Sequence, residues 1–294
     1  MNNYSSQKIF DKSALVMHRN RASKNIEQYD NLIEQISQNL IERLNEVNMN
    51  FQTVLDLGCN TGQLTRMVKS SLNPNILISA DISEQMLKKF SGNKVVADEE
   101  IIPFKNKSFN LVLSTFALNY VNQLPKVLKQ ILACLKPNGL FIGTVFGEKT
   151  LTELKLSILE SEIKIKGGAS PRIMPMFNIR DIGNLLQQIG YNLTVVDSDL
   201  ITYQYENFMD LVRALRGMGI TNILSKRDKN YLGKKTLEEM GKNYLKKFGN
   251  KQNKISATFE ILYLTGWSPH YSQQKPLKPG SAEHSLSSIL NSKK

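Results

Sequence analysis

Short apolar runs alternate with amphipathic stretches through the first half of the chain. The apolar runs predict buried strands near residues 51–57, 76–80, 93–97, 109–115 and 140–146. The amphipathic stretches predict helices at 63–71, from Ser83 onward, and at 124–135. Strands that alternate with helices over short links are typical of a parallel sheet with helices on both faces. We therefore expect an α/β fold with a doubly wound, mostly parallel sheet.

The second half of the chain is less regular. Its patterns predict strands at 193–203 and 256–265, and helices at 150–165, 179–189, 207–216 and 226–247. Neither an internal repeat nor a linker-like boundary divides this part. We expect residues 51–266 to form one domain, with a helical insertion at about 204–254 before the last strand.

The two ends of the chain differ from its centre. Residues 1–22 are polar and basic, and helical periodicity runs from Ser23, a plausible N-cap, to about Asn48. We expect residues 1–50 to form an N-terminal helical segment. The tail at 267–294 is rich in Ser, Pro and Lys, and we expect it to be flexible.

The formal charge is +12, from 38 basic and 26 acidic residues. This charge fits nucleic acid, an anionic membrane surface, an acidic protein, or simply lysines scattered over a solvated surface, and we favour the last interpretation. No dense run of Lys and Arg contains interleaved aromatic residues, so we expect no nucleic-acid partner. No apolar run approaches the roughly 20 residues that span a bilayer. We expect no transmembrane segment, while peripheral membrane contact stays open.

The two cysteines, Cys59 and Cys134, lie in apolar segments expected to be buried. Buried free thiols fit a reducing compartment, and two cysteines allow neither a disulfide framework nor a zinc site. The N-terminus lacks a signal pattern of basic and then apolar residues. We expect a cytoplasmic protein.

A glycine-punctuated turn follows the first predicted strand. Gly58 and Gly62 allow the backbone to turn tightly and to approach a ligand. Asp56 stands near the strand's end, where open α/β sheets bind ligands. Asp81 ends the second strand, where a carboxylate accepts hydrogen bonds from ribose hydroxyls, and Asp98 follows the third. The alternative for each carboxylate is a structural hydrogen bond or a helix cap.

These motifs together resemble the class I S-adenosylmethionine-dependent methyltransferases. The resemblance rests on the segments at 55–62, 80–83, 97–104 and 135–139. It implies a Rossmann-like fold and S-adenosylmethionine as cofactor. It also implies that Asp56 and the turn hold the methionine moiety, Asp81 the ribose, and Asp98, or its neighbour Glu99, the adenine. The expected donor-binding residues are Asp56, Gly58, Cys59, Asn60, Gly62, Asp81, Ile82, Asp98, Glu99 and Ser114.

One position departs from this family. Asn60 stands where the family usually has glycine. Asparagine tolerates a left-handed backbone better than most residues do, so we expect the turn to be preserved.

The segment at 114–121 follows the fourth predicted strand and should border the site of methyl transfer. Asn119 and Tyr120 are our candidates for catalytic residues, since they could face a substrate. The alternative, equally favoured, is a packing segment with Tyr120 partly buried. The N-terminal residues that could form a lid over the donor are Tyr4, Arg19, Arg21 and Tyr29, although a surface-packed helix is the somewhat favoured alternative.

The back half resembles the bacterial and mitochondrial complex I assembly-factor methyltransferase-like proteins. The similar segments are 167–175, 181–190, 217–222 and 266–282. This resemblance implies a respiratory complex I subunit as partner, and arginine hydroxylation as an activity of the mitochondrial members. A more distant similarity is to the malonyl-acyl-carrier-protein methyltransferase of biotin synthesis, which implies an acidic carrier protein.

Metal-dependent hydroxylation commonly uses two histidines and a carboxylate. The three histidines, His18, His270 and His284, are spread between the two ends of the chain, and we expect no metal site. Methyl transfer from a sulfonium needs orientation and desolvation more than a dedicated base. We therefore expect a methyltransferase that acts on a protein or carrier-bound acceptor, with the 204–254 insertion helping to form the acceptor site. The alternatives are an arginine hydroxylase and a non-catalytic assembly factor.

Overall fold

The computed structural model describes residues 8–229, 232–274 and 280. Most of the tail expected at 267–294 lies outside the described residues, as do Tyr4 and His284. No helix in the described part of the chain is both long enough and apolar enough to cross a membrane.

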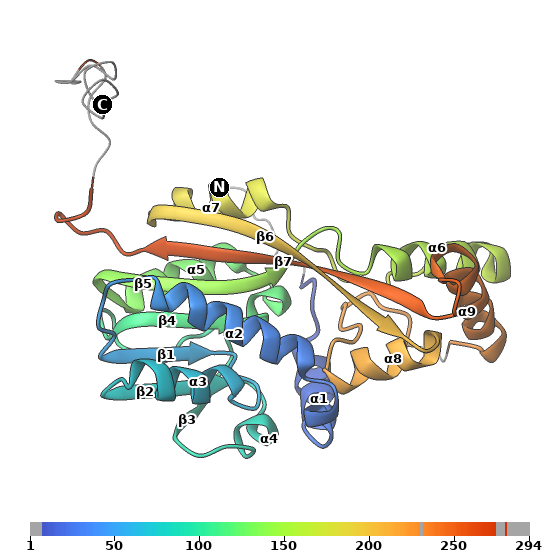
Figure 1. Ribbon diagram of the computed structural model, residues 1–294, viewed down its shortest axis with the longest axis horizontal. Helices are drawn as coiled ribbons and strands as arrows, with labels where there is room; N and C mark the ends of the chain where they lie inside the picture. Colours follow the sequence, from blue (N-terminus) through green and yellow to red (C-terminus); the bar gives the residue numbers. More distant parts are fainter. Residues whose placement is uncertain (1–7, 230–231, 275–279, 281–294) are drawn as a thin grey trace, which may run out of the picture.

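Seven strands form one sheet in the order β3-β2-β1-β4-β5-β7-β6 (Figure 1). Strands β1 to β5 pair in parallel, and β7 runs antiparallel to β5 and β6. This confirms the predicted doubly wound, mostly parallel sheet. The chain winds in opposite directions from β1 and from β4, so the ligand crevice of such a sheet is expected at the carboxyl ends of these strands. The strands are β1 Thr53–Leu57, β2 Ile76–Asp81, β3 Asn93–Val96, β4 Phe109–Thr115, β5 Leu135–Phe146, β6 Asn192–Tyr205 and β7 Ile255–Trp267.

Helices cover both faces of the sheet because consecutive strand residues point to opposite sides. On one face, α2 (Asn31–Asn45) and α3 (Gln63–Leu72) share a core with Val54 of β1. On the other face, α5 (Leu124–Cys134) and α7 (Ile179–Ile189) share a core with the next residue, Leu55. Burial on both sides explains why β1 reads as a continuous apolar run. The short helix α4 (Glu84–Leu87) follows β2, and the Ser83 side chain caps it by accepting a hydrogen bond from the Met86 amide.

Strands β6 and β7 extend past the rest of the sheet and carry a helical lobe. Strand β5 pairs with β7 only over Ile261–Trp267, whereas β6 pairs with β7 as far as Ile255. Helices α6 (Thr152–Lys166), α8 (Phe208–Gly217) and α9 (Lys234–Phe248) gather at the far end of this two-stranded extension (Figure 1). Along the chain, helices α8 and α9 come between β6 and β7, where the insertion was predicted. The start of α9 at Lys234, after Gly233, corrects the expected start near 226.

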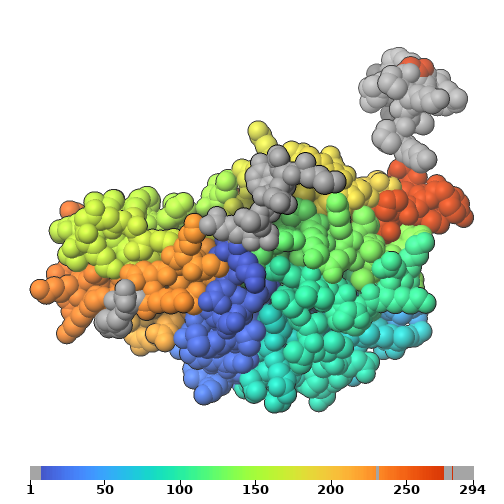
Figure 2. Space-filling view, turned by 180° about the vertical axis from the view of Figure 1, so that it is seen from behind, coloured from blue at the N-terminus to red at the C-terminus, as the bar shows by residue number. Residues whose placement is uncertain are grey.

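The N-terminal segment differs from the expectation. Helix α1 (Lys12–Ala22), which was not predicted, and a short 3-10 helix precede α2, so the helix predicted from Ser23 to about Asn48 begins only at Asn31. Ser23 is the C-cap of α1, whose N-cap Asp11 accepts a hydrogen bond from the Ala14 amide, and the residue before α2 is Asp30. Helix α1 has no clear apolar face because it contacts both α4 and α8. In the view from behind, the blue N-terminal residues lie between the sheet and the orange lobe (Figure 2).

Candidate functional site

The turn after β1 adopts the left-handed backbone that its glycines allow. Gly58, Asn60 and Gly62 have φ angles of 75°, 49° and 76°. A Cβ on Gly58 would lie 2.1 Å from the Ala117 Cβ, so no other residue fits there. Asn60 shows the geometry that was predicted for it, and its backbone amide donates to the Asp81 carboxylate at 3.0 Å. The turn is thereby fixed to the end of β2.

Asp56 is fully buried in β1, beneath the turn. Its Oδ2 atom accepts a hydrogen bond of 2.6 Å from the Thr65 hydroxyl of α3. Burial raises the pKa of Asp56 to about 7, because the charged carboxylate is poorly solvated there. Its Oδ1 atom is buried without a hydrogen-bond partner among the described residues. Such an atom is costly to leave unpaired, so it marks a place where a ligand's donor group would fit.

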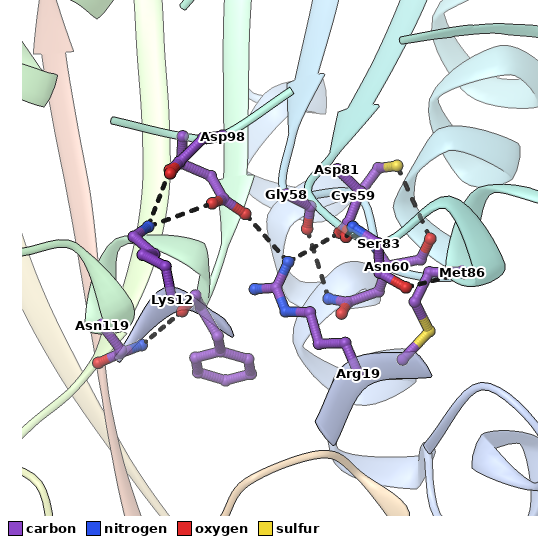
Figure 3. A network of polar contacts seen from close by, with 12 residues as sticks. Lys12, Arg19, Gly58, Cys59, Asn60, Asp81, Ser83, Met86, Asp98 and Asn119 are labelled. Carbon is purple, nitrogen blue, oxygen red and sulfur yellow. Dashed lines mark hydrogen bonds and ion pairs between the residues drawn. The ribbon is translucent and has the colours of Figure 1, made fainter. Parts of the chain in front are cut away.

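Asp81 lies at the carboxyl end of β2 and is fully buried. It accepts hydrogen bonds from two backbone amides, those of Ser83 and Asn60. A third donor is the Arg19 guanidinium of α1, at 3.0 Å. The ribose candidate is therefore in direct contact with the N-terminal segment (Figure 3).

Arg19 is buried and bridges two carboxylates. Its Nη1 atom lies 3.0 Å from Asp81 Oδ2 and 3.0 Å from Glu99 Oε1. Burial lowers the pKa of Arg19, but Asp81 and Glu99 more than offset this effect and hold the pKa above its ordinary value. The guanidinium also lies 5.8 Å from the centre of the Tyr120 ring. The sequence suggested Arg19 as a lid residue, but it gave no signal for these ion pairs.

The two acidic residues after β3 have different surroundings. Glu99 is fully buried beside Arg19, and burial raises its pKa even though Arg19 lowers it. Its Oε2 atom has no hydrogen-bond partner among the described residues, but it lies 3.7 Å from the Lys12 ammonium, within ion-pair distance. Asp98 is partly exposed and pairs with Lys12 of α1 at 2.8 Å. Glu99 is therefore the more buried of the two carboxylates, as expected of a residue that binds a ligand in the interior.

The segment after β4 contains the two catalytic candidates. The Asn119 amide donates to the Phe116 carbonyl at 2.9 Å, and its Oδ1 accepts from the Phe146 amide at 2.9 Å. Asn119 therefore ties the ends of β4 and β5 together. Burial raises the pKa of Tyr120 to about 12, so its phenol stays protonated near neutral pH. At that pH Tyr120 can donate a hydrogen bond but does not act as a base.

The remaining donor candidates lie around these carboxylates. Cys59 is buried, and burial raises the pKa of its thiol. Ser114 is buried in β4, and its hydroxyl has no hydrogen-bond partner among the described residues. Ile82 packs against the apolar cluster that contains Tyr120. The structure thus brings the predicted donor residues together at one edge of the sheet, except that Asp98 turns toward Lys12.

A small cavity of about 70 Å³ lies next to this edge. Met174 and Arg172 line it from one loop, and Leu215 and Thr221 line it from the end of α8. Met174 also packs against the cluster of Tyr120 and Ile82. Met174 therefore connects the cavity to the cluster that contains Tyr120. The cavity also includes residues of the back-half motifs.

The described residues contain no group of three or more His, Cys, Asp and Glu side chains that could hold a metal ion. His18 contacts the Thr221 hydroxyl, and burial together with Arg21, Arg227 and Arg216 lowers its pKa. His270 contacts the Ser272 hydroxyl at 2.7 Å at the surface. His18 and His270 thus have structural partners in the described part of the chain.

The comparison with protein families agrees with this arrangement. A family model described as "Methyltransferase domain" matches residues 22–196, more than half of the chain. The Haemonchus contortus phosphoethanolamine N-methyltransferase 2, solved in complex with S-adenosyl-L-methionine, has the same fold, with a TM-score of 0.52 at 15% identity. That comparison covers 84% of this chain and 57% of the other. The chain belongs to the methyltransferase-domain family and has the class I S-adenosylmethionine-dependent methyltransferase fold.

A narrower relationship is also present. The chain is 35% identical to a Danio rerio protein named "Arginine-hydroxylase NDUFAF5, mitochondrial", over 96% of this chain and 89% of that protein. It belongs to the same family as that protein, as the back-half motifs predicted. A Methylovorus malonyl-[acyl-carrier protein] O-methyltransferase is 27% identical over 89% of this chain and 90% of its own length.

Proposed function

We propose that the chain binds S-adenosylmethionine at the carboxyl ends of β1, β2 and β4 and transfers its methyl group to a protein or carrier-bound acceptor. The observation that carries this proposal is three buried polar atoms without hydrogen-bond partners among the described residues, Asp56 Oδ1, Ser114 Oγ and Glu99 Oε2, the last of which lies 3.7 Å from Lys12. All three lie on the segments that the family uses for its donor. Buried polar atoms are normally paired, so a ligand with several donor groups fits this edge.

Each part of the donor has a proposed partner. Asp56 and the turn at 58–62 would hold the methionine moiety, and Asp81 would accept hydrogen bonds from the ribose. Glu99, rather than Asp98, would receive a donor group from the adenine side, because Glu99 is buried beside Asp81 and Asp98 is not. Arg19 contacts the same carboxylates, so the ribose reaches Asp81 only if the Arg19 side chain or α1 moves.

The bound donor supplies an activated methyl group on a sulfonium. The residues of the chain orient the acceptor and exclude water, which are the main requirements of this transfer. Tyr120 would face the acceptor as a protonated phenol and position it through a hydrogen bond. Held by Asp56, the turn at 58–62 and Asp81, the donor would supply the methyl group and would leave as a neutral thioether, while the acceptor would lose its proton to solvent. No side chain needs to act as a strong base.

Arginine hydroxylation is the second candidate, because the relative with 35% identity carries that name. A non-catalytic assembly role is the third. In the first two cases a protein is modified, either a respiratory complex I subunit or, by analogy with the Methylovorus relative, an acidic carrier protein. We propose a cytoplasmic location, since both cysteines are free and buried, as is usual in a reducing compartment. We also propose that residues 1–50 cover the site of a methyltransferase domain at 51–266.

The acceptor's mass separates the three candidates. Partner proteins from cells with and without this protein would be compared by mass spectrometry. A gain of one methyl group supports transfer, and a gain of one oxygen supports hydroxylation. An unchanged mass contradicts both enzyme activities.

Binding of S-adenosylmethionine tests the cofactor separately. Calorimetry should show binding to the unaltered protein and much weaker binding to Asp81→Ala. Lys88→Ala is the matched control, because Lys88 is exposed beside α4 and pairs only with Glu84 among the described residues. Absence of binding in every case would remove the cofactor assignment.

A further inference from the structure

The helical lobe contains a groove that the proposed methyl transfer does not use. It lies between α8 and α9 and has a volume of about 550 Å³. Phe208 and Ile255 are buried beneath it, and Leu237 and Gly241 of α9 line its wall. Met209 and Leu245 border it and are 40% and 41% exposed. The groove thus presents apolar side chains to solvent. The lobe that contains it projects from the sheet (Figure 1).

The dimensions of the groove suit a helix. Its α9 wall runs from Lys234 to Leu245, which are eleven residues apart. At 1.5 Å per residue this is roughly 16 Å, or about three helical turns. An amphipathic helix that binds in a groove uses apolar anchors at successive turns over a similar length. Gly241 stands in the middle of this wall and leaves room for such an anchor.

The groove has more positive than negative side chains along its wall, which favours a partner with acidic residues. Lys234 and Lys242 line the groove from α9, with Glu238 between them. Lys234 lies 3.9 Å from Glu238, and no ion pair between described residues involves Lys242. Outside the groove lining, α9 also contains Lys235 and Lys246, while Lys247 pairs with Glu160 and Glu239 pairs with Lys164. A partner with acidic residues beside its apolar anchors is complementary to this surface.

We propose that the α8–α9 groove binds an amphipathic helix of a partner protein, with apolar anchors over Gly241 and acidic flanks toward Lys234 and Lys242. This inference concerns the docking of a protein and does not depend on which group is transferred. A membrane surface is the competing occupant. It fits the groove less well, because a bilayer covers protruding side chains and cannot fill a concave groove between two helices.

A glycine variant tests the groove at a position where the backbone has room for a Cβ, and denaturant titration of the variant would check that it remains folded. A Cβ at Gly241 would meet the Phe208 Cβ at 3.5 Å, an ordinary contact, so Gly241→Leu places a side chain in the groove. Replacing a helical glycine also favours the helix. Gly183→Leu is the matched control, because Gly183 lies in α7 and its Cβ would meet only Val196, at 3.6 Å.

The probe is a fluorescein-labelled synthetic helix of about five turns, with leucines on one face and glutamates beside them. A second peptide has lysines in place of the glutamates. Binding to the full chain would be measured by fluorescence anisotropy. We expect the acidic peptide to bind at least about tenfold more tightly than the basic one, since charge complementarity contributes to the affinity.

In the Gly241→Leu variant we expect a loss of at least about tenfold in affinity for the acidic peptide, and in Gly183→Leu no loss. Lys242→Glu should reduce the preference for the acidic peptide. Binding of S-adenosylmethionine should be the same in all these proteins, which separates a failure of the groove from a failure of the proposed cofactor.

Several outcomes would overturn the proposal. They are equal affinity for the two peptides, affinity unaffected by Gly241→Leu, and absence of saturable peptide binding. Vesicles of phosphatidylcholine with and without phosphatidylglycerol provide the last comparison. Sedimentation with the anionic vesicles that is lost in Gly241→Leu, without peptide binding, would assign the groove to a membrane surface instead.

Discussion

At the scale of single residues, the site depends on how a few buried charges are balanced. Asp81 and Glu99 share one guanidinium, that of Arg19. Asp56 has a single hydroxyl partner and a pKa near 7. A buried charge without a partner is strongly destabilising, so each of these side chains affects both folding and ligand binding.

Replacing Arg19 should separate these two effects. Arg19→Met leaves the buried Asp81 without its counter-ion and leaves Glu99 with only Lys12, at 3.7 Å, so the free energy of unfolding should fall by about 3–5 kcal/mol. The same change removes the competitor for Asp81, so the affinity for S-adenosylmethionine should rise by about tenfold. Denaturant titration and calorimetry measure the two quantities. Arg21→Met, an exposed position on the same helix, is the control. A weaker affinity in Arg19→Met would show that Arg19 is part of the donor site.

Asp56 predicts a dependence of stability on pH. Its pKa is about 7 in the folded chain, against an ordinary value of 3.8. A carboxyl whose pKa is raised by folding stabilises the folded state fully below pH 3.8, and this contribution is lost as the pH rises toward 7. Asp56→Asn, which stays neutral, should therefore be more stable than the unaltered protein at pH 8, by up to about 4 kcal/mol. At pH 4 the two proteins should be similar.

Denaturant titrations at pH 4 to 8 would measure this difference, with the exposed Glu27→Gln as control. If the difference between Asp56→Asn and the unaltered protein does not change with pH, folding does not raise the pKa of Asp56. A positively charged donor group beside Asp56 would favour ionisation, so S-adenosylmethionine binding near pH 6 should release protons.

At the scale of elements, the N-terminal segment is positioned by close backbone packing. A Cβ on Gly217, at the end of α8, would lie 2.1 Å from the Tyr29 ring. Arg19 of α1 pairs with Asp81 at the end of β2, and Lys12 pairs with Asp98 after β3. Helix α1 also contacts α8, so it connects the lobe to the donor edge. A substitution in the lobe should therefore change the affinity for the donor.

Two glycines test this packing. Gly217→Ala should lower the free energy of unfolding by about 1–3 kcal/mol, because the Tyr29 ring must move. Gly241→Ala, in α9, should raise it by about 0.5–1 kcal/mol, since its Cβ has room and alanine favours the helix. Chemical denaturation of both variants measures the change in the free energy of unfolding, which should be negative for Gly217→Ala and positive for Gly241→Ala. If Gly217→Ala stabilises the protein as much as Gly241→Ala does, the Tyr29 ring moves aside without destabilising the fold.

At the scale of the whole molecule, ligand binding should stabilise the fold. At 100 times its dissociation constant, S-adenosylmethionine should add about 2.7 kcal/mol to the free energy of unfolding. For a chain of this size that corresponds to a rise in melting temperature of roughly 5 °C. Scanning calorimetry with and without the donor measures this rise, and Asp81→Ala should lose most of it. A rise of the same size in Asp81→Ala would place the donor elsewhere.

The sequence by itself determined the sheet and the turn after β1, where we propose the donor site. Strands β1 and β4 are covered on both faces, and this burial leaves a continuous apolar run in the sequence. The turn at 58–62 needs left-handed residues, and Gly58, Asn60 and Gly62 supply them. Local patterns of this kind are visible in the sequence because the residues that create them are close together in the chain.

Only the tertiary structure decided what those residues meet. The contact of Arg19 with Asp81 joins positions 62 residues apart, and the contact with Glu99 joins positions 80 apart. Helix α1 gave no periodic signal, because it packs against two elements and has a buried arginine in place of an apolar stripe. The different surroundings of Glu99 and Asp98 depend on Arg19 and Lys12 of α1, and the hydrogen bond from the Phe146 amide to Asn119 comes from β5. Side-chain type limits what a residue can bind, whereas the fold decides which partner is within reach.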